Sequence, residues 1–476
     1  MSNVRVNLGL VVGRDAEINR SPEISISGGD GVTLIQNNDA FRMEADTTGI
    51  QSKLNGQAGQ YISFDENGSM IPVDKPFELY GFEFDNLESN PESKIRYFGD
   101  NVNYTPARMG TSSFDYGDWG NAFFIKNLKP CMLNYDGSVA YDLDKNDYSK
   151  KADGTASDIA NEAFGGNAMV GIPTVWIKVD TTNADMPRVY ISDKQIDDTY
   201  HAYAHHDNAG NAMPYTYLPI YNGWLDSNIR LRSLSGKSPK VADIGRVQIP
   251  EARANNPSGT DIWDIEKFVD CNLINLLLML ISKTTNTQAA FGKGYTGQSQ
   301  RLSSGILNSS GLFWGSISSE AFPVKVFGIE NWWGNIERRI FGLLAMNPDN
   351  TIYYKLTKGT EDGSTVYGFD QDAWLGSSEP YGWINSHLTK SGGYVKSIAI
   401  GEDASIIPYE AGASDSTYMC DYQAYNLNIT KPIAMFGGNT SESIGAIGAF
   451  GIGFSRNSET GGVRTGASIS CKPNVL

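Results

Sequence analysis

The chain has 476 residues, of which 40% are hydrophobic and 19% are charged, and its formal net charge is −16. An acidic surface repels phosphate backbones and no Lys/Arg cluster offsets this repulsion, so we expect no nucleic-acid partner. The 51 glycines and the many aromatic residues favour short strands and long ordered loops over amphipathic helices.

Two segments bear on where the protein is located. Residues 1–6 lack the basic segment and the apolar stretch of a secretory signal. The longest apolar run, residues 273–281, is far shorter than the roughly 20 residues that a membrane span needs. We therefore expect a protein that is synthesised in a cytoplasm and is not inserted into a membrane.

Residues 1–75 consist of short β-segments separated by turns. Residues 24–27 alternate between apolar and polar side chains, and a glycine-rich break separates them from a second strand-like segment at residues 32–35. Residues 59–68 and 70–73 predict a hairpin around an Asn-Gly turn. No segment here has enough apolar residues for a core of its own. The region is therefore predicted either to be an attachment and oligomerisation segment stabilised by partner chains or to be a small β-domain that packs on the neighbouring domain.

Residues 76–476 show high aromatic density without a linker, which predicts one large domain of the α+β class. One long helix is expected, capped by Asp261, with apolar spacing from Trp263 and a buried second half up to residue 281. A shorter helix is expected near residues 157–164. Strands are expected at residues 174–179, 188–192, 324–327 and 351–356.

A series of short motifs runs in a fixed order from about residue 77 to the end of the chain. They include Tyr104-Thr-Pro-Ala-Arg-Met, Phe114-Asp-Tyr-Gly-Asp-Trp, Lys129-Pro-Cys-Met-Leu, Arg232-Ser-Leu-Ser-Gly-Lys-Ser-Pro, Val326-Phe-Gly-Ile-Glu-Asn-Trp-Trp-Gly-Asn, Gly448-Ala-Phe-Gly-Ile-Gly-Phe and Gly466-Ala-Ser-Ile-Ser-Cys-Lys-Pro. Each motif is short, but together the series resembles a module of tailed-phage head and tail fibres.

The resemblance implies a C-type-lectin-like fold of the formylglycine-generating-enzyme-like branch in residues 76–476. It also implies a structural protein on the virion surface, as a head or a tail fibre, which binds a glycan or protein receptor of the host cell. A homotrimer attached to other virion proteins, of capsid or tail, through residues 1–75 belongs to the same expectation. A formylglycine-generating-type enzyme and a bacterial surface adhesin are the alternatives.

The enzyme alternative depends on cysteine spacing, because that enzyme family works through two close cysteines near the chain end. Here the nearest cysteine before Cys471 is Cys420, so no catalytic residue and no enzymatic activity are expected. The cysteines form no C-x-x-C pair, which predicts free, mostly buried thiols instead of a zinc site. They are Cys131, Cys271, Cys420 and Cys471.

Two patterns imitate metal sites. His201 and His205 are four residues apart, but they lack the Glu of a metalloprotease motif, so no metal is expected there. Residues 142–153 begin like a calcium loop but have Asp147 at the sixth position and Asp153 at the twelfth, where Gly and Glu are required. An Asx-rich turn is the preferred interpretation. No cofactor is expected, although the resemblance leaves room for a structural calcium ion elsewhere.

Candidate receptor-binding residues lie in polar or glycine-rich segments, where binding specificity is often placed on a rigid scaffold. They are Trp314, Trp374, Tyr381, Trp383, Asn439, Ser441, Arg456, Asn457 and Arg464. The motif at residues 330–335, with Trp332 and Trp333, is predicted to pack in the core, with an exposed carbohydrate-binding patch as the alternative.

Overall fold

The computed structural model describes most of the chain. The described residues are 32–37, 40–45, 61–64, 70–73, 77–207, 210–346, 353–356, 383–384, 392–401, 403–424, 426, 428, 433–441, 447–455 and 462–474. The chain divides into two compact units, Met1–Glu78 and Leu79–Leu476.

The described residues of the first unit form two antiparallel strand pairs. β1 (Val32–Asn37) pairs with β2 (Ala40–Ala45), and β3 (Tyr61–Phe64) pairs with β4 (Met70–Val73). The hairpin predicted at residues 59–73 is therefore confirmed as β3–β4. The strand predicted at residues 24–27 lies outside the described residues.

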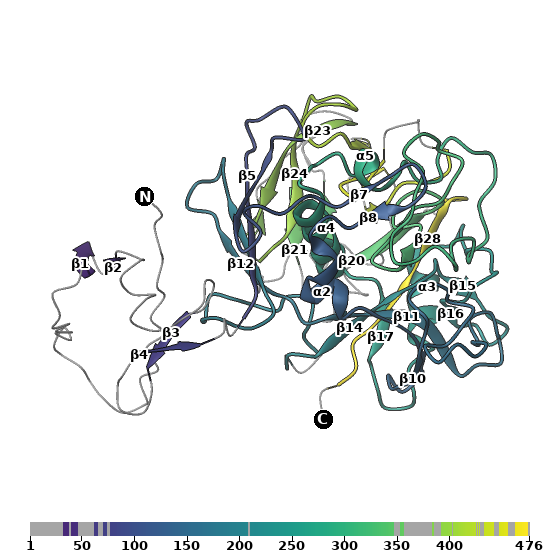
Figure 1. The fold of residues 1–476 in the computed structure, drawn as a ribbon. Coiled ribbons are helices and arrows are strands. Elements are labelled where there is room, and N and C mark those ends of the chain that lie inside the picture. Colours follow the sequence, from purple (N-terminus) through teal and green to yellow (C-terminus); the bar gives the residue numbers. More distant parts are fainter. Residues whose placement is uncertain are drawn as a thin grey trace. The chain divides into compact units, whose positions relative to one another are not determined.

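In its described residues, the second unit contains four larger sheets and three small strand pairs (Figure 1). The first sheet has the order β10-β9-β11-β14-β29-β17. Its strands are β9 (Lys129–Asn134), β10 (Val139–Asp142), β11 (Gly166–Pro173), β14 (Tyr215–Pro219), β17 (Trp263–Ile265) and β29 (Ile469–Cys471). All eight residues of β11 are buried, as expected for a central strand.

The other three large sheets contain the remaining long strands. The second has the order β12-β13-β5-β6, the third β22-β21-β20-β26-β27 with β28 parallel to β20, and the fourth β24-β23-β25. Their bounds are β5 (Leu79–Phe84), β6 (Ile95–Gly99), β12 (Trp176–Asp180), β13 (Arg188–Ser192), β20 (Glu337–Met346), β21 (Tyr353–Leu356), β22 (Trp383–Ile384), β23 (Gly392–Ile400), β24 (Ile406–Ala411), β25 (Tyr422–Ala424), β26 (Ile433–Phe436), β27 (Ile452–Gly453) and β28 (Thr465–Ala467).

The small pairs and the helices connect these sheets. The pairs are β7 (Arg108–Met109) with β8 (Phe114–Asp115), β15 (Trp224–Leu225) with β16 (Leu231–Arg232), and β18 (Lys325–Val326) with β19 (Ile329–Glu330). The helices are η1 (Trp119–Asn121), α2 (Phe123–Lys126), α3 (Gly245–Arg253), α4 (Phe268–Ser282) and α5 (Thr287–Phe291). Within the described part of the chain, no helix is both long and apolar enough to span a bilayer.

Helix α4 lies in the middle of the second unit (Figure 1), and nearly all of its residues are buried. Its continuous apolar run can be buried because β6, β20 and β24, from three of the large sheets, contact the helix. The Tyr97 hydroxyl of β6 donates to the Leu280 carbonyl, and Asn272 accepts the Ile406 N–H of β24 at 3.2 Å. The helix ends at Ser282, and the next residue, the C-cap Lys283, adopts a left-handed conformation with φ 53°.

Buried charges tie the start of α4 to two of these sheets. The Arg338 guanidinium of β20 is 3.0 Å from the Glu266 carboxylate, and the Lys472 ammonium beyond β29 is 2.9 Å from Asp270. All four side chains are nearly inaccessible to solvent. These two ion pairs therefore hold the start of α4 to β20 and to the residue that follows β29.

The predicted α+β class, with a C-type-lectin-like domain, is wrong. The fold is mostly β-sheet, with the four larger sheets in a propeller-like arrangement. In the described part of the chain α4 is the only helix longer than nine residues. The physical reason is the composition: glycine and aromatic residues form many short strands, while the α+β expectation gave one apolar helix too much weight.

Two helix predictions are also wrong in detail. The long helix starts at Phe268, because Trp263–Ile265 instead pair with β29 as strand β17. Residues 157–164 form turns and no helix. The strand prediction for residues 188–192 is confirmed as β13, and the other three predicted strands overlap β12, β18 and β21.

Candidate functional site

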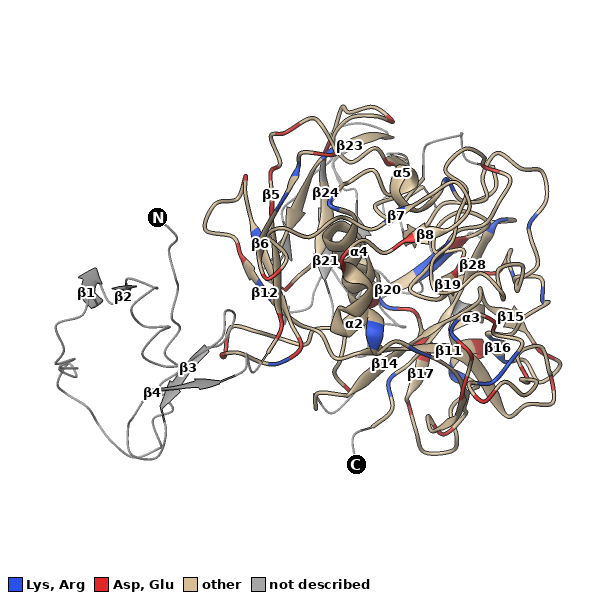
Figure 2. Cartoon of the chain, in the orientation of Figure 1, with Lys and Arg blue, Asp and Glu red and all other residues tan. Residues whose placement is uncertain are grey.

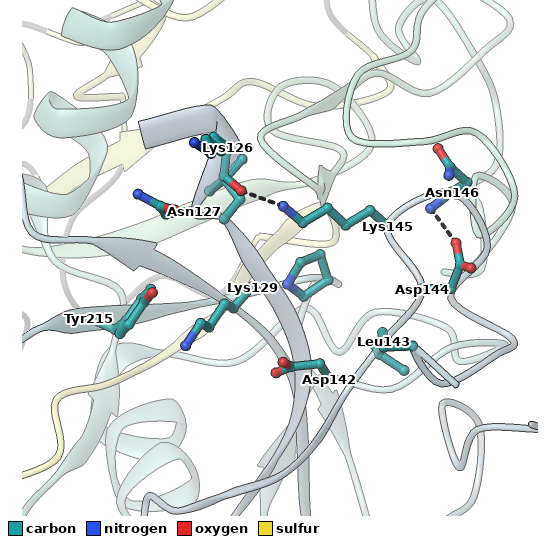
Figure 3. Close-up of a pocket in the computed structure, with 12 residues that line it drawn as sticks. Lys126, Asn127, Lys129, Asp142, Leu143, Asp144, Lys145, Asn146 and Tyr215 are labelled. Atoms are coloured by element: carbon teal, nitrogen blue, oxygen red, sulfur yellow. Dashed lines mark hydrogen bonds between the residues drawn. The ribbon is translucent and has the colours of Figure 1, made fainter. Parts of the chain in front are cut away.

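A polar cleft of about 380 Å³ opens where the end of α2, strands β9, β10 and β14, and the turn after β10 meet (Figure 3). Its lining is made of amine, carboxylate, amide, phenol and aliphatic groups. The lining residues are Lys126, Asn127, Leu128, Lys129, Pro130, Asp142, Leu143, Asp144, Lys145, Asn146, Ala152 and Tyr215.

Local sequence places the walls of the cleft. Leu128 and Pro130 are buried, whereas Lys129 between them is half-buried at the start of β9. Strand β10 pairs with β9 through an irregular register, and the Leu143 N–H donates to the Pro130 carbonyl at 2.8 Å. This pairing fixes the strand-end residue Asp142 at the mouth, where it is exposed.

The rim beyond β10 is an Asx turn. Asp144 Oδ1 accepts the backbone N–H groups of Asn146 at 2.7 Å and of Asp147 at 3.1 Å. Asp153 makes the same kind of turn with Thr155. The segment that imitates a calcium loop therefore uses these carboxylates to hold turns, as the preferred sequence interpretation predicted. Among the described residues no group of three His, Cys, Asp or Glu is placed to hold a metal ion.

The charged side chains of the cleft have distinct partners. The Lys129 ammonium lies 4.5 Å from the centre of the Tyr215 ring, a cation–π contact. The Lys145 ammonium reaches across the cleft and donates to the Lys126 carbonyl at 2.7 Å (Figure 3). Burial lowers the pKa of Lys145, and the nearby Asp142 carboxylate opposes this shift. The arrangement offers an aromatic face together with donors and acceptors for a polar ligand.

The described receptor-binding candidates have different environments. Ser441 is exposed, and Arg464 is half-buried with Nε donating to Thr440 Oγ1 at 2.9 Å. Asn439 is buried, and its Oδ1 accepts the Ser441 N–H at 2.9 Å, so it supports the turn instead of facing solvent. Trp314 is half-buried against Phe322, with ring centres 6.0 Å apart.

The other predicted receptor-binding residues lie in one short strand or outside the described part of the chain. Trp383 lies in strand β22. Trp374, Tyr381, Arg456 and Asn457 lie outside the described residues. Of the predicted residues, the structure brings together Asn439 and Ser441 in one turn and links Arg464 to it through Thr440.

The four cysteine thiols and one histidine, His205, are buried in the second unit. All four cysteines are free and buried, as predicted. Burial raises the pKa of Cys420 to about 12 and raises those of the other three thiols further, which disfavours a reactive thiolate. His205 is also buried, 3.2 Å from the Ile172 carbonyl, and burial with the nearby Lys472 charge lowers its pKa to about 3.

Sequence reasoning missed the cleft. Its lysines, Lys126, Lys129 and Lys145, are spread over 20 residues, and Tyr215 comes from a distant strand. Because these residues form no motif along the sequence, no local signal marks the cleft. No protein-family model matches the sequence, and no curated protein matches it.

Proposed function

We propose that this chain is a non-enzymatic structural protein of a tailed-phage particle, a head or tail fibre on the virion surface, that binds a glycan or protein of the host cell. The phage part of the proposal rests on the ordered motif series. The observation that carries the binding role is the open cleft beside Tyr215, with its amine, amide and carboxylate lining.

The placement of the cleft on a sheet supports this role. Lys129 and Tyr215 belong to β9 and β14, which both pair with the fully buried strand β11. A binding site on such strands keeps its geometry when ligand arrives, so little ordering cost opposes binding.

The two strand pairs of the first unit support attachment through the N-terminal region. β1–β2 and β3–β4 are both two-stranded, and an isolated pair of this size is marginally stable in water. The proposal therefore includes a homotrimer, held to capsid or tail proteins through residues 1–75, and synthesis in the host cytoplasm.

Binding of the purified full chain to an array of bacterial surface glycans and to host cells tests the binding role. We expect Tyr215→Ala to reduce the binding about tenfold or more, because the aromatic wall is lost. The double variant Ser441→Ala and Arg464→Ala is the comparison, since these residues represent the C-terminal loops. Loss of binding in the loop variant alone would place the binding site in the C-terminal loops instead of the cleft. Absence of binding to any glycan or cell would reject the proposal.

Antibody labelling of purified phage particles tests the virion part. Electron microscopy should show label at the capsid or the tail, and label confined to free protein would contradict a virion role.

A further inference from the structure

We infer that the cleft takes a singly charged acidic saccharide, a sugar ring that carries one carboxylate. The inference rests on the proposed function, since it names the class of glycan that the same site would bind. Three observations support it: the net charge of the cleft, the burial and hydrogen bonding of the Lys145 ammonium, and the polar groups beside Tyr215.

The first observation is a local excess of positive charge. Three ammonium groups, those of Lys126, Lys129 and Lys145, line the cleft together with the two carboxylates of Asp142 and Asp144. One positive charge therefore remains, although the whole chain has a formal net charge of −16. The end of α2, which carries Lys126, is blue in Figure 2.

The three lysines also lack ion-pair partners within the part of the chain that the structure describes. The neighbouring Lys150, in contrast, is 3.1 Å from the Asp147 carboxylate. An excess of one charge matches a ligand with one negative charge better than a phosphate with two, because complementary charge is what the site can compensate.

Lys145 adds a reason for the anion to enter the cleft. This ammonium is half-buried, and the partner it has is a neutral carbonyl, that of Lys126. Its loss of hydration is only partly offset by Asp142, which is why its pKa is lowered. A carboxylate bound beside it would replace the lost hydration with a charge-assisted hydrogen bond.

The aromatic, carboxylate and amide groups that line the cleft favour a sugar over an inorganic anion. The Tyr215 ring is half-buried and forms a wall of the cleft, and such rings stack on the apolar face of a sugar. Asp142 and the amides of Asn127 and Asn146 are exposed at the same cleft and can bind hydroxyl groups. An inorganic anion would use neither the ring nor the acceptors.

Calorimetric titration of the full chain with galacturonate, which carries one carboxylate, and with galactose, its neutral counterpart, tests the inference at low ionic strength. We expect galacturonate to bind about tenfold more tightly than galactose, which corresponds to one charge-assisted hydrogen bond. Lys126→Gln and Lys129→Gln should each reduce that preference severalfold. Lys396→Gln removes the same charge from β23, where Lys396 pairs with Glu410, and should leave the preference unchanged.

Equal binding of galacturonate and galactose, or equal effects of the cleft and β23 variants, would overturn the acidic-sugar inference and leave the proposed function standing. Absence of binding by either sugar, while the chain still binds host cells, would overturn it as well. Failure of the chain to bind any glycan or cell is the separate outcome that rejects the proposed function.

Discussion

Trp332 shows how a conspicuous motif can serve the core. Its side chain is fully buried, its Nε1 donates to Asn275 Oδ1 at 3.1 Å, and the Arg338 guanidinium lies 4.7 Å from its ring. Phe436 packs at 5.1 Å between ring centres. The prediction of core packing for this motif is confirmed, and the alternative of an exposed carbohydrate patch is wrong.

The Trp332→Ala variant should lose roughly 3–5 kcal/mol of unfolding free energy, because an aromatic site is emptied and Asn275 loses its donor. Urea denaturation of the purified protein measures the loss. Trp314→Ala is the matched control, since that ring is half-buried, and it should cost less than half as much. Equal losses would show that the two rings are packed alike.

Asp421 is a buried carboxyl that should make stability depend on pH. It accepts the Phe450 N–H at 2.7 Å and the Gln288 amide at 3.0 Å, and no cation of the described residues forms an ion pair with it. Burial raises its pKa from 3.8 to about 7, and the two hydrogen bonds oppose the shift. The neutral form is favoured by folding, so its stabilisation is full below about pH 4 and is lost as the pH rises through about 7.

Asp421→Asn should remove this dependence, because the amide stays neutral at every pH. Between pH 5 and pH 8 we expect the parent chain to lose on the order of a few kcal/mol more unfolding free energy than the variant does. Urea denaturation of both proteins at both pH values measures this difference. The other titrating groups contribute equally to the two proteins, so their effects cancel in it. Parallel behaviour of the two proteins would mean that Asp421 is ionised in the folded state.

At the scale of elements, the start of α4 depends on the ion pair between Glu266 and Arg338. Burial raises the pKa of Glu266 to about 7, and the Arg338 charge opposes the shift. Arg338→Met should cost about 3–5 kcal/mol, since it leaves a buried carboxylate without its cation. Adding Glu266→Gln should recover part of the loss, and urea denaturation of the two single variants and the double variant measures the coupling. Independent, additive losses would contradict a coupled pair.

Local pattern predicted the elements whose formation is local. The strand at residues 188–192 alternates, the hairpin at 59–73 is marked by its Asn-Gly turn, and the apolar run of α4 marks a buried helix. Trp263–Ile265 were misassigned because their pairing with β29 joins segments about 200 residues apart. The cleft was missed for the same reason, since its walls meet only after α2, β9 and β14 are assembled.

At the scale of the whole molecule, the two-stranded pairs β1–β2 and β3–β4 predict association. Light scattering of the purified full chain should give three times the chain mass, unchanged over a tenfold dilution. A monomer mass with residues 1–75 intact would remove the reason for proposing a trimer.

Strand β29 lies between β14 and β17 in the first sheet, although it comes about 250 residues after β14 and about 200 residues after β17. During synthesis, the edges of β14 and β17 therefore wait for residues 469–471 to leave the ribosome. Until then these strand edges remain unpaired, and unpaired strand edges can associate with other chains. A chain that stops before residue 469 therefore lacks the strand that joins β14 to β17 in this sheet.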